Sequence, residues 1–272
     1  MKILVTGSSG FVGGHLTKNL SRHEVVPYDI KEGRDILDEA RLRKHLKGVD
    51  VVVHLAGLVS GPDSLKRPDD YLRTNGWGSY LVIKNSIKSG VKRIIITSSA
   101  AVYGQPLNPY GASKIWAESS AESLKSQIEV VVPRPFNIYG INQNPAYGYA
   151  IHSFIEGIMK NCSVNIYGYG RQTRDFIYVD DIVKFYKYLI TAKKVPNFPF
   201  DLGTGRSVEV LKLASIIGKI LKRGYKKVFL PKRIEPYESR AKTKDLANFY
   251  DMGSFVNLET GIKKLLKLQG MI

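Results

Sequence analysis

The sequence is short of cysteine, of acidic residues and of long apolar runs. Its 272 residues include a single cysteine, Cys162, so no disulfide can form within the chain, and we expect a reducing, cytoplasmic location. No apolar run is long enough to span a bilayer, and the N-terminus MKILVTG lacks the apolar region and cleavage site of a signal peptide. No group of His, Cys or carboxylate residues has metal-site spacing, so we expect no metal.

Acidic residues are outnumbered, with 24 Asp and Glu against 41 Lys and Arg and a net charge of +17. The excess is heaviest late in the chain, at Lys222, Arg223, Lys226, Lys227, Lys232, Arg233, Arg240, Lys242, Lys244, Lys263, Lys264 and Lys267. Such a surface can be simply solvated, or it can attract a phosphorylated substrate, an anionic membrane or nucleic acid. We expect no nucleic-acid partner. Weak contact with an anionic membrane is a hypothesis that sedimentation with anionic vesicles at low salt would test.

Short Val- and Ile-rich runs alternate with helical segments through about residue 135, which predicts an α/β fold with a doubly wound, parallel, Rossmann-type sheet. The expected strands are 2–6, 24–28, 51–55, 93–97 and 129–134, and the expected helices are 10–20, 40–46, 70–89 and 109–126. After about residue 140, expected helices 150–160, 180–191 and 208–221 are separated by irregular segments. We therefore expect a cofactor-binding domain over 1–140, to which later segments return, and a smaller α/β substrate lobe over 141–272.

A glycine turn follows the first expected strand and opens the first expected helix. Its first glycine allows a tight turn, its second lets the backbone approach a pyrophosphate, and its third lets helix pack on strand. The second strand ends at Asp29, whose carboxylate can accept hydrogen bonds from ribose hydroxyls and repels a 2′-phosphate. The pattern predicts NAD rather than NADP, with a glycine turn that binds nothing as the alternative. The turn residues expected to bind the cofactor are Gly7, Ser9, Gly10, Phe11, Val12 and Gly13.

Tyr110 and Lys114 are four residues apart and so share a helix face. Asn108 is a good N-cap and Pro109 a good first helical residue, which places Tyr110 in the first turn. There the helix dipole, the ammonium of Lys114 and an oxidised nicotinamide would lower the pKa of the phenol. Ser99, at the end of the preceding strand, can donate a hydrogen bond to the reacting oxygen. The trio suits proton transfer on a sugar hydroxyl during hydride transfer, with an incidental Tyr and Lys on an amphipathic helix as the alternative.

With these motifs the chain resembles the extended branch of the short-chain dehydrogenase/reductase superfamily, specifically its NAD-dependent nucleotide-sugar epimerases and dehydratases, over about residues 1–262. The resemblance implies that Ser99, Tyr110 and Lys114 are catalytic and that Tyr110 and Lys114 also contact NAD. It further implies cofactor contacts from Asp35, Ile36, Leu55, Ala56, Gly57, Asn75 and Pro135. The family often dimerises through a four-helix bundle, to which helices 70–89 and 109–126 would contribute here.

Two later segments, Arg134–Gly140 and Val164–Asp181, resemble the substrate-binding motifs of the same family. They imply that Asn137, Asn165, Tyr167 and Arg174 bind a nucleotide sugar. Ser99 would also contact the substrate, at its reacting hydroxyl. The family's late Arg-Pro-Gly-Asp segment, which gives a second phosphate arginine, is absent, and Arg233 is the nearest substitute. The loop between Gly104 and Tyr110 is about a dozen residues shorter than usual, so we expect a more open sugar pocket.

The residues after Ser99 bear on the reaction. In 4,6-dehydratases an Asp-Glu pair typically follows this serine, whereas this chain has Ala100 and Ala101 and so lacks the acid and base for dehydration. The segment resembles the 4-epimerases, in which the 4-hydroxyl is oxidised to a ketone, the ketosugar rotates and hydride returns to the opposite face. We expect an NAD-dependent UDP-glucose/UDP-galactose-type 4-epimerase. The alternatives are a keto-sugar reductase or other nucleotide-sugar-modifying enzyme, and a non-catalytic Rossmann protein that senses NAD or binds RNA.

Overall fold

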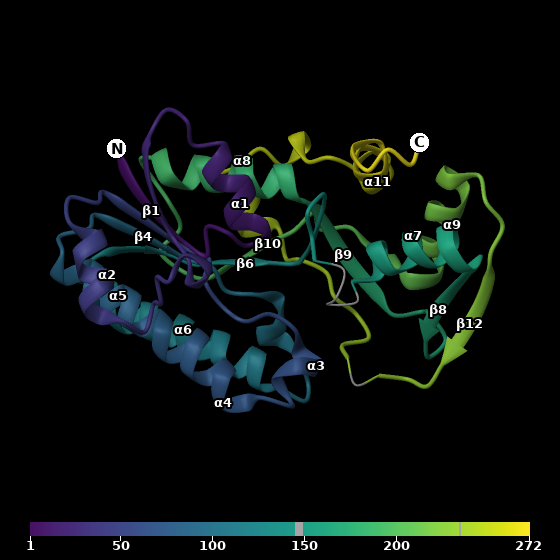
Figure 1. Cartoon of the computed structure of the whole chain (residues 1–272), viewed down its shortest axis with the longest axis horizontal. Coiled ribbons are helices and arrows are strands. Elements are labelled where there is room, and N and C mark those ends of the chain that lie inside the picture. Colours follow the sequence, from purple (N-terminus) through teal and green to yellow (C-terminus); the bar gives the residue numbers. More distant parts are fainter. Residues whose placement is uncertain (145–148, 234) are drawn as a thin grey trace. The chain divides into compact units, whose positions relative to one another are not determined.

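The computed structural model describes residues 1–144, 149–233 and 235–272, which fall into two compact units (Figure 1). Unit 1 holds Met1–Pro135 and Ile182–Leu202, and unit 2 holds Phe136–Asp181 and Gly203–Ile272. The expected boundary at residue 140 lies a few residues after this break. Strand β7 (Asn137–Tyr139) accordingly belongs to unit 2, where it pairs with β9 (Thr173–Tyr178).

Unit 1 is built around a parallel five-stranded sheet of order β2-β1-β3-β4-β5. Its strands are β1 (Lys2–Thr6), β2 (Glu24–Tyr28), β3 (Val51–His54), β4 (Arg93–Ile96) and β5 (Glu129–Val131). The three central strands are buried along almost their whole length, as their unbroken Val and Ile content requires of strands covered on both faces. The α/β fold with a parallel Rossmann-type sheet is confirmed.

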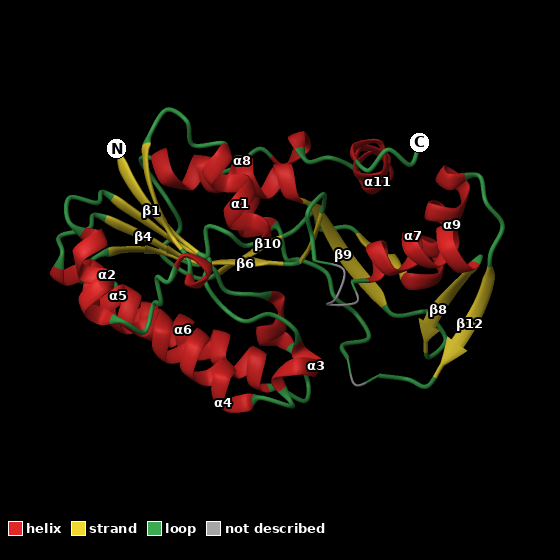
Figure 2. Ribbon diagram, viewed as in Figure 1, coloured by secondary structure: helices red, strands yellow, loops and turns green. Residues whose placement is uncertain are grey.

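Helices cover both faces of this sheet (Figure 2). On one face lie α2 (Glu39–Leu46), α5 (Gly78–Lys88) and α6 (Pro109–Leu124), and on the other lie α1 (Phe11–Lys18) and most of α8 (Val179–Thr191). Leu4, Val52 and Ile94 from the sheet share one apolar cluster with Val82 of α5 and Ala117 of α6. This packing fixes α6, which carries Tyr110 and Lys114, against the end of β4.

Three expected elements are divided in the structure. The expected helix 70–89 consists of α4 (Pro68–Tyr71), a π-helical turn (Leu72–Trp77) and α5, with α3 (Gly61–Ser64) just before it. The expected strand 129–134 is split into β5 and β6 (Pro133–Pro135), because β5 pairs with β4 whereas β6 pairs with β10 (Phe200–Leu202), and a proline has no N–H for a ladder. The start of expected helix 208–221 is strand β11 (Ser207–Glu209), which pairs with β9.

Unit 2 holds a three-stranded sheet of order β11-β9-β7 and a parallel pair, β8 (Ser163–Tyr167) with β12 (Lys226–Leu230). Its helices are α7 (Ala150–Asn161), α9 (Val210–Leu221), α10 (Lys244–Ala247) and α11 (Leu258–Leu268). A second apolar cluster joins Tyr139, Phe154, Ile166, Leu213 and Leu265. Each unit therefore has its own core.

Short 3-10 helices at Ile30–Glu32, Ala100–Tyr103 and Met252–Ser254 complete the described elements. No described helix has both the length and the apolar character needed to cross a bilayer. Within the described residues, no three His, Cys, Asp or Glu side chains are grouped as metal ligands.

In the core of unit 2, α11 packs closely against β7 at Gly261. A Cβ added at Gly261 would lie 1.9 Å from the hydroxyl oxygen of the buried Tyr139. We predict that Gly261→Ala lowers the free energy of unfolding by about 2 kcal/mol, because the ring must move to admit the methyl group. The control is Gly224→Ala, where an added Cβ meets nothing within 4 Å. Equal urea unfolding midpoints for the two variants would contradict this packing.

Candidate active site

The glycine turn lies at the end of β1 and is packed too tightly for side chains at two positions. Gly7 has a φ of +70°, and a Cβ there would lie 2.7 Å from the Ala56 nitrogen. A Cβ on Gly13 would lie 2.0 Å from the Gly7 carbonyl oxygen. Ser9 and Gly10 remain exposed at the start of α1, where the first N–H groups of a helix have no intrahelical acceptor. This geometry fits a pyrophosphate approaching the helix N-terminus.

Asp29 is buried at the end of β2 and joins that strand to the glycine turn. Its Oδ2 accepts a hydrogen bond from the Ser9 backbone N–H at 2.9 Å, and its Oδ1 accepts one from the Lys31 N–H at 2.9 Å. Each carboxylate oxygen can accept a second hydrogen bond, so the side chain fits a ribose diol while it orders the turn. Nearby, Ile36 is buried in the core, and the Asp35 carbonyl accepts a bond from the Tyr28 hydroxyl at 2.8 Å.

The segment after β3 is held by two polar side chains. Thr6 Oγ1 accepts hydrogen bonds from the Leu55 and Ala56 N–H groups, each at 3.2 Å. Asn75 is fully buried in the π-helical turn, and its side-chain amide hydrogen-bonds both backbone groups of Leu58. Its Oδ1 accepts from the Leu58 N–H at 2.8 Å, and its Nδ2 donates to the Leu58 carbonyl at 2.9 Å and to Ser113 Oγ at 3.1 Å. A Cβ on Gly57 would meet Asn75 Oδ1 at 2.8 Å. Asn75 therefore orders the backbone of residues 57–58.

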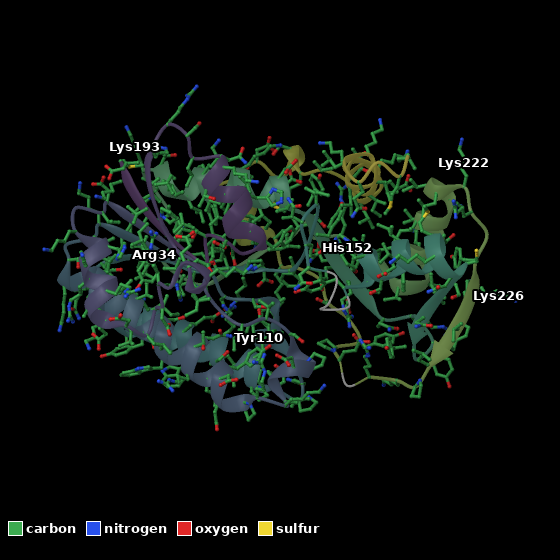
Figure 3. The ribbon with its side chains drawn as sticks, in the orientation of Figure 1. Arg34, Tyr110, His152, Lys193, Lys222 and Lys226 are labelled. Carbon is green, nitrogen blue, oxygen red and sulfur yellow. The ribbon has the colours of Figure 1, made fainter. Side chains whose placement is uncertain are left out.

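The structure brings Ser99, Tyr110 and Lys114 together at the end of β4 and the start of α6, where Figure 3 labels Tyr110. Asn108 caps α6 as expected, with its Oδ1 accepting from the Gly111 N–H at 2.9 Å. The Ser99 hydroxyl, which accepts a hydrogen bond from the Ala101 N–H at 3.1 Å, is close enough to the Tyr110 phenol to affect its pKa. Lys114 Nζ donates to the Thr97 carbonyl at 2.8 Å. A hydroxyl, a phenol and an ammonium thus face one end of the parallel sheet.

Burial controls the titration of this trio. It raises the pKa of the Tyr110 phenol, and the nearby Ser99 hydroxyl only partly opposes it. Burial lowers the pKa of Lys114 to about 8, against an upward effect of the Glu118 carboxylate. Without the cofactor, burial is therefore the largest effect on the Tyr110 phenol, and the expected lowering by the helix dipole, Lys114 and an oxidised nicotinamide together stays a prediction. The charge of an oxidised nicotinamide is a separate contribution.

A buried ion pair lies behind the trio and was missed at the level of sequence. Glu118 accepts hydrogen bonds from Ser98 Oγ at 2.5 Å and from Arg134 Nε at 2.7 Å, and its second oxygen accepts from Arg134 at 2.6 Å. Arg134 also donates to the Tyr103 hydroxyl at 2.8 Å, which donates to Asp201 at 2.7 Å. The available signal was spacing, since Glu118 follows Lys114 by one helical turn.

Unit 2 places four of the expected substrate residues around the β8–β9 connection. Arg174 pairs with Glu235 at 2.5 Å and donates to the Pro236 carbonyl at 2.9 Å. The Arg233 guanidinium lies over the Tyr167 ring, 3.3 Å from its centre. Asn165 is exposed on β8. Separately, Asn137 Nδ2 donates to the Asp175 carbonyl at 2.9 Å. The pairing of Arg174 with a carboxylate of its own chain was not expected.

Asp175 is a second residue that sequence reasoning missed. Its buried carboxylate accepts hydrogen bonds from Thr204 N at 3.0 Å, Thr204 Oγ1 at 2.6 Å, Gly205 N at 2.8 Å and Ala241 N at 3.2 Å. Burial nevertheless raises the pKa of this carboxyl. Asp175 thereby holds the Gly203–Gly205 turn beside Arg174, its sequence neighbour.

Residues 3–203 match the NAD dependent epimerase/dehydratase family. The chain belongs to this family. An uncharacterized UDP-glucose epimerase of Bacillus subtilis is 28% identical over 261 residues, covering 81% of this chain and 82% of the relative. A dTDP-D-glucose 4,6-dehydratase of Mus musculus is 27% identical over 262 residues, covering 81% of this chain and 73% of the relative.

Among solved structures, a UDP-glucuronic acid 4-epimerase from Bacillus cereus, in complex with UDP-glucuronic acid and NAD, superposes with a TM-score of 0.90. It is 26% identical, with 100% of both chains covered. This epimerase/dehydratase family is NAD-dependent, and the glycine turn and Asp29 described above fit that cofactor. The chain is thus an NAD-dependent nucleotide-sugar-modifying enzyme.

The lowered pKa of Lys114 predicts a pH dependence of stability. Between about pH 8 and pH 10 the unfolded chain binds a proton that folded Lys114 does not, since burial lowers its pKa from 10.5 to about 8. The free energy of unfolding should therefore rise with pH across this window, by of the order of 3 kcal/mol relative to Lys114→Met. Urea unfolding of both proteins at several pH values measures the difference. Parallel curves would show that Lys114 titrates normally.

Proposed function

We propose that this chain is an NAD-dependent 4-epimerase of nucleotide sugars, interconverting UDP-hexoses of the glucose and galactose type by transient oxidation at carbon 4. One observation carries the proposal. The Ser99, Tyr110 and Lys114 cluster is complete, and the 3-10 helix that follows Ser99 begins with Ala100 and Ala101, where a dehydratase needs a carboxylic acid and a carboxylate. Proton transfer at a hydroxyl is supported, and elimination of water is not.

The chain's own residues handle the proton. NAD, when bound, would supply reversible hydride transfer at carbon 4. Tyr110, as phenolate, takes the proton of the 4-hydroxyl, and Ser99 orients that hydroxyl by a hydrogen bond. Lys114 donates a hydrogen bond to the Thr97 carbonyl. When Lys114 is protonated, its positive charge stabilises the Tyr110 phenolate. On the return step Tyr110 donates the proton to the oxygen at carbon 4.

Cofactor contacts are proposed for the glycine turn, Asp29 and the backbone that Thr6 and Asn75 hold after β3. Substrate contacts are proposed for residues of unit 2. Arg174 and Arg233 offer guanidinium groups to the diphosphate, and Tyr167 and Asn165 flank the base. The excess of basic residues late in the chain suits an anionic ligand.

We also propose a homodimer through the π-helical turn Leu72–Trp77, α5 and α6. Trp77 and Trp116 are each 42% exposed, and Ile115 is 38% exposed, although all three are large and apolar. A second copy of the chain would cover them in a four-helix bundle. Light scattering should give twice the chain mass, and Trp116→Glu should give the monomer.

The single cysteine supports the proposal that the enzyme works in the cytoplasm.

The deciding experiment offers the purified protein UDP-glucose and UDP-galactose separately, without added cofactor, and follows the configuration at carbon 4 by NMR. Interconversion supports the epimerase and shows that NAD is retained. Turnover that consumes added reduced cofactor would favour the keto-sugar reductase instead. Appearance of a 4-keto-6-deoxy product would favour a dehydratase.

Removal of the Tyr110 hydroxyl tests the proposed catalytic role. Tyr110→Phe should lower turnover by at least about a thousandfold while NAD binding is kept, because only the transferable proton is lost. Steady-state kinetics and cofactor content measure the two effects. Ser123→Ala, which removes an exposed hydroxyl on the same helix, is the control, and normal activity in Tyr110→Phe would remove Tyr110 from the reaction.

Arg174 should act mainly on binding. We expect Arg174→Ala to weaken UDP binding about tenfold or more, because it removes a bidentate donor for phosphate oxygens. Isothermal titration with UDP gives the dissociation constant. An unchanged constant, in a variant that keeps its unfolding midpoint, would contradict the assignment.

A further inference from the structure

Loop Leu58–Gly61, between β3 and α3, holds the only non-glycine residue of described unit 1 with a positive φ. Ser60 has φ 109° and ψ 108°, outside the left-handed helical region that non-glycine residues tolerate best. A residue held in so sparsely populated a conformation requires surrounding contacts that fix it, and such residues gather at functional sites.

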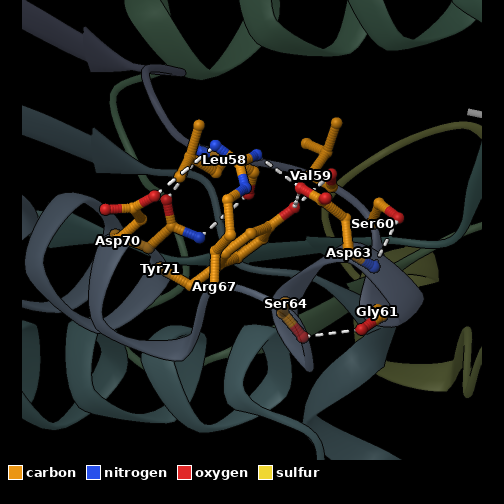
Figure 4. A network of polar contacts seen from close by, with 10 residues as sticks. Leu58, Val59, Ser60, Gly61, Asp63, Ser64, Arg67, Asp70 and Tyr71 are labelled. Carbon is orange, nitrogen blue, oxygen red and sulfur yellow. Dashed lines mark hydrogen bonds and ion pairs between the residues drawn. The ribbon is translucent and has the colours of Figure 1, made fainter.

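The contacts that fix Ser60 come from both sides (Figure 4). On one side Asn75 grips both polar backbone groups of Leu58. The Tyr71 hydroxyl, fully buried, donates to the Val59 carbonyl at 2.7 Å. On the other side Ser60 Oγ accepts from the Asp63 N–H at 3.2 Å. The peptide before Ser60 is therefore clamped by Tyr71.

The Tyr71 hydroxyl also contacts a charged side chain, the carboxylate of Asp63. It lies 3.0 Å from Asp63 Oδ2, which accepts a hydrogen bond from Arg67 at 2.5 Å. The single proton of the Tyr71 hydroxyl is thus shared between the Val59 carbonyl, its nearer acceptor, and Asp63. The hydrogen bond from Arg67 is the largest effect that keeps the pKa of Asp63 below its usual range, so the carboxylate stays ionised. Asp63, Arg67 and Tyr71 form a brace across α3 and α4.

The same brace touches the proposed proton carrier. The ring of Tyr71 packs edge-to-face on that of Tyr110, with centres 6.1 Å apart and planes at 79°. A Cβ on Gly61 would lie 2.7 Å from Nδ2 of Asn108, the N-cap of α6. A shift of the loop would therefore be transmitted to the helical turn that carries Tyr110.

We propose, resting on the proposed function, that Tyr71 is a positioning residue for Tyr110: its hydroxyl holds the strained Val59–Ser60 backbone, and its ring fixes the orientation of the phenol. Without the hydroxyl, Ser60 relaxes toward a common conformation and the loop leaves Asn108. A glycine at position 60 adopts φ 109° at little cost, so the clamp would no longer be needed.

The test is a rescue experiment. Tyr71→Phe keeps the ring and removes the clamp, and we expect turnover of the nucleotide sugar to fall about tenfold with little change in KM, as a small displacement of a reacting group costs. Ser60→Gly alone should keep wild-type turnover. The double variant Ser60→Gly/Tyr71→Phe should recover most of the lost turnover, which a merely structural loss of the Tyr71 hydroxyl would not.

The matched control is Lys222→Gly in the Tyr71→Phe background. Lys222 also has a positive φ, 54°, at the end of α9, so its replacement relieves a similar conformation far from this loop in the sequence. It should not restore turnover. Equal recovery with Lys222→Gly, no recovery with Ser60→Gly, or wild-type turnover of Tyr71→Phe would each overturn the proposal. Loss of turnover in Ser60→Gly alone would also overturn it, by assigning the role to the Ser60 hydroxyl.

A second readout does not depend on activity. In protein labelled with 13C at tyrosine Cζ, the Tyr110 signal, identified by its loss in Tyr110→Phe, should shift in Tyr71→Phe and return in the double variant. If the wild-type protein turns over no nucleotide sugar, the proposed function fails. The Tyr110 signal alone then tests whether Tyr71 positions Tyr110. An unshifted signal in Tyr71→Phe would overturn that proposal.

Discussion

The hydrogen bond from Lys114 Nζ to the Thr97 carbonyl joins α6 to the end of β4 at the centre of the candidate site. It places a buried ammonium there, on a helix that the apolar core holds against the sheet. Three consecutive residues after β4 face three positions of that helix. The Thr97 carbonyl accepts a hydrogen bond from Lys114, Ser98 donates one to Glu118, and the Ser99 hydroxyl is close enough to Tyr110 to affect its pKa. Positions 110, 114 and 118 recur every helical turn, whereas 97, 98 and 99 continue an extended strand.

These contacts explain why the buried ammonium of Lys114 is tolerated. Lys114 is desolvated enough to lower its pKa to about 8, yet it has a carbonyl acceptor and the Glu118 carboxylate within its helix. Glu118 in turn is satisfied by Ser98 and Arg134. A lysine with a pKa close to neutrality responds strongly to whatever charge binds beside it. Tyr110, whose pKa is raised by burial, lies one helical turn before this lysine.

The sequence predicted features that reside in local pattern. The Val- and Ile-rich strands, the Asn108 cap and the i, i+4 spacing of Tyr110 and Lys114 are all local, and the structure has each of them. It did not predict contacts made across long separations, such as Asn75 with Leu58 or Arg174 with Glu235. Nor did it predict the burial that raises the pKa of Tyr110 in the protein without cofactor, because local charges are visible in a sequence and the depth of burial is not.

The central claim is that the hydrogen on carbon 4 leaves and returns to the same carbon while Tyr110 carries the hydroxyl proton. UDP-glucose carrying deuterium at carbon 4 tests this directly when the reaction is run in ordinary water and the product is examined by NMR and mass spectrometry. The account predicts UDP-galactose with the deuterium still at carbon 4 and no solvent hydrogen at carbons 5 and 6. Loss of the label from carbon 4, or solvent hydrogen at carbon 5, would contradict it and favour an elimination.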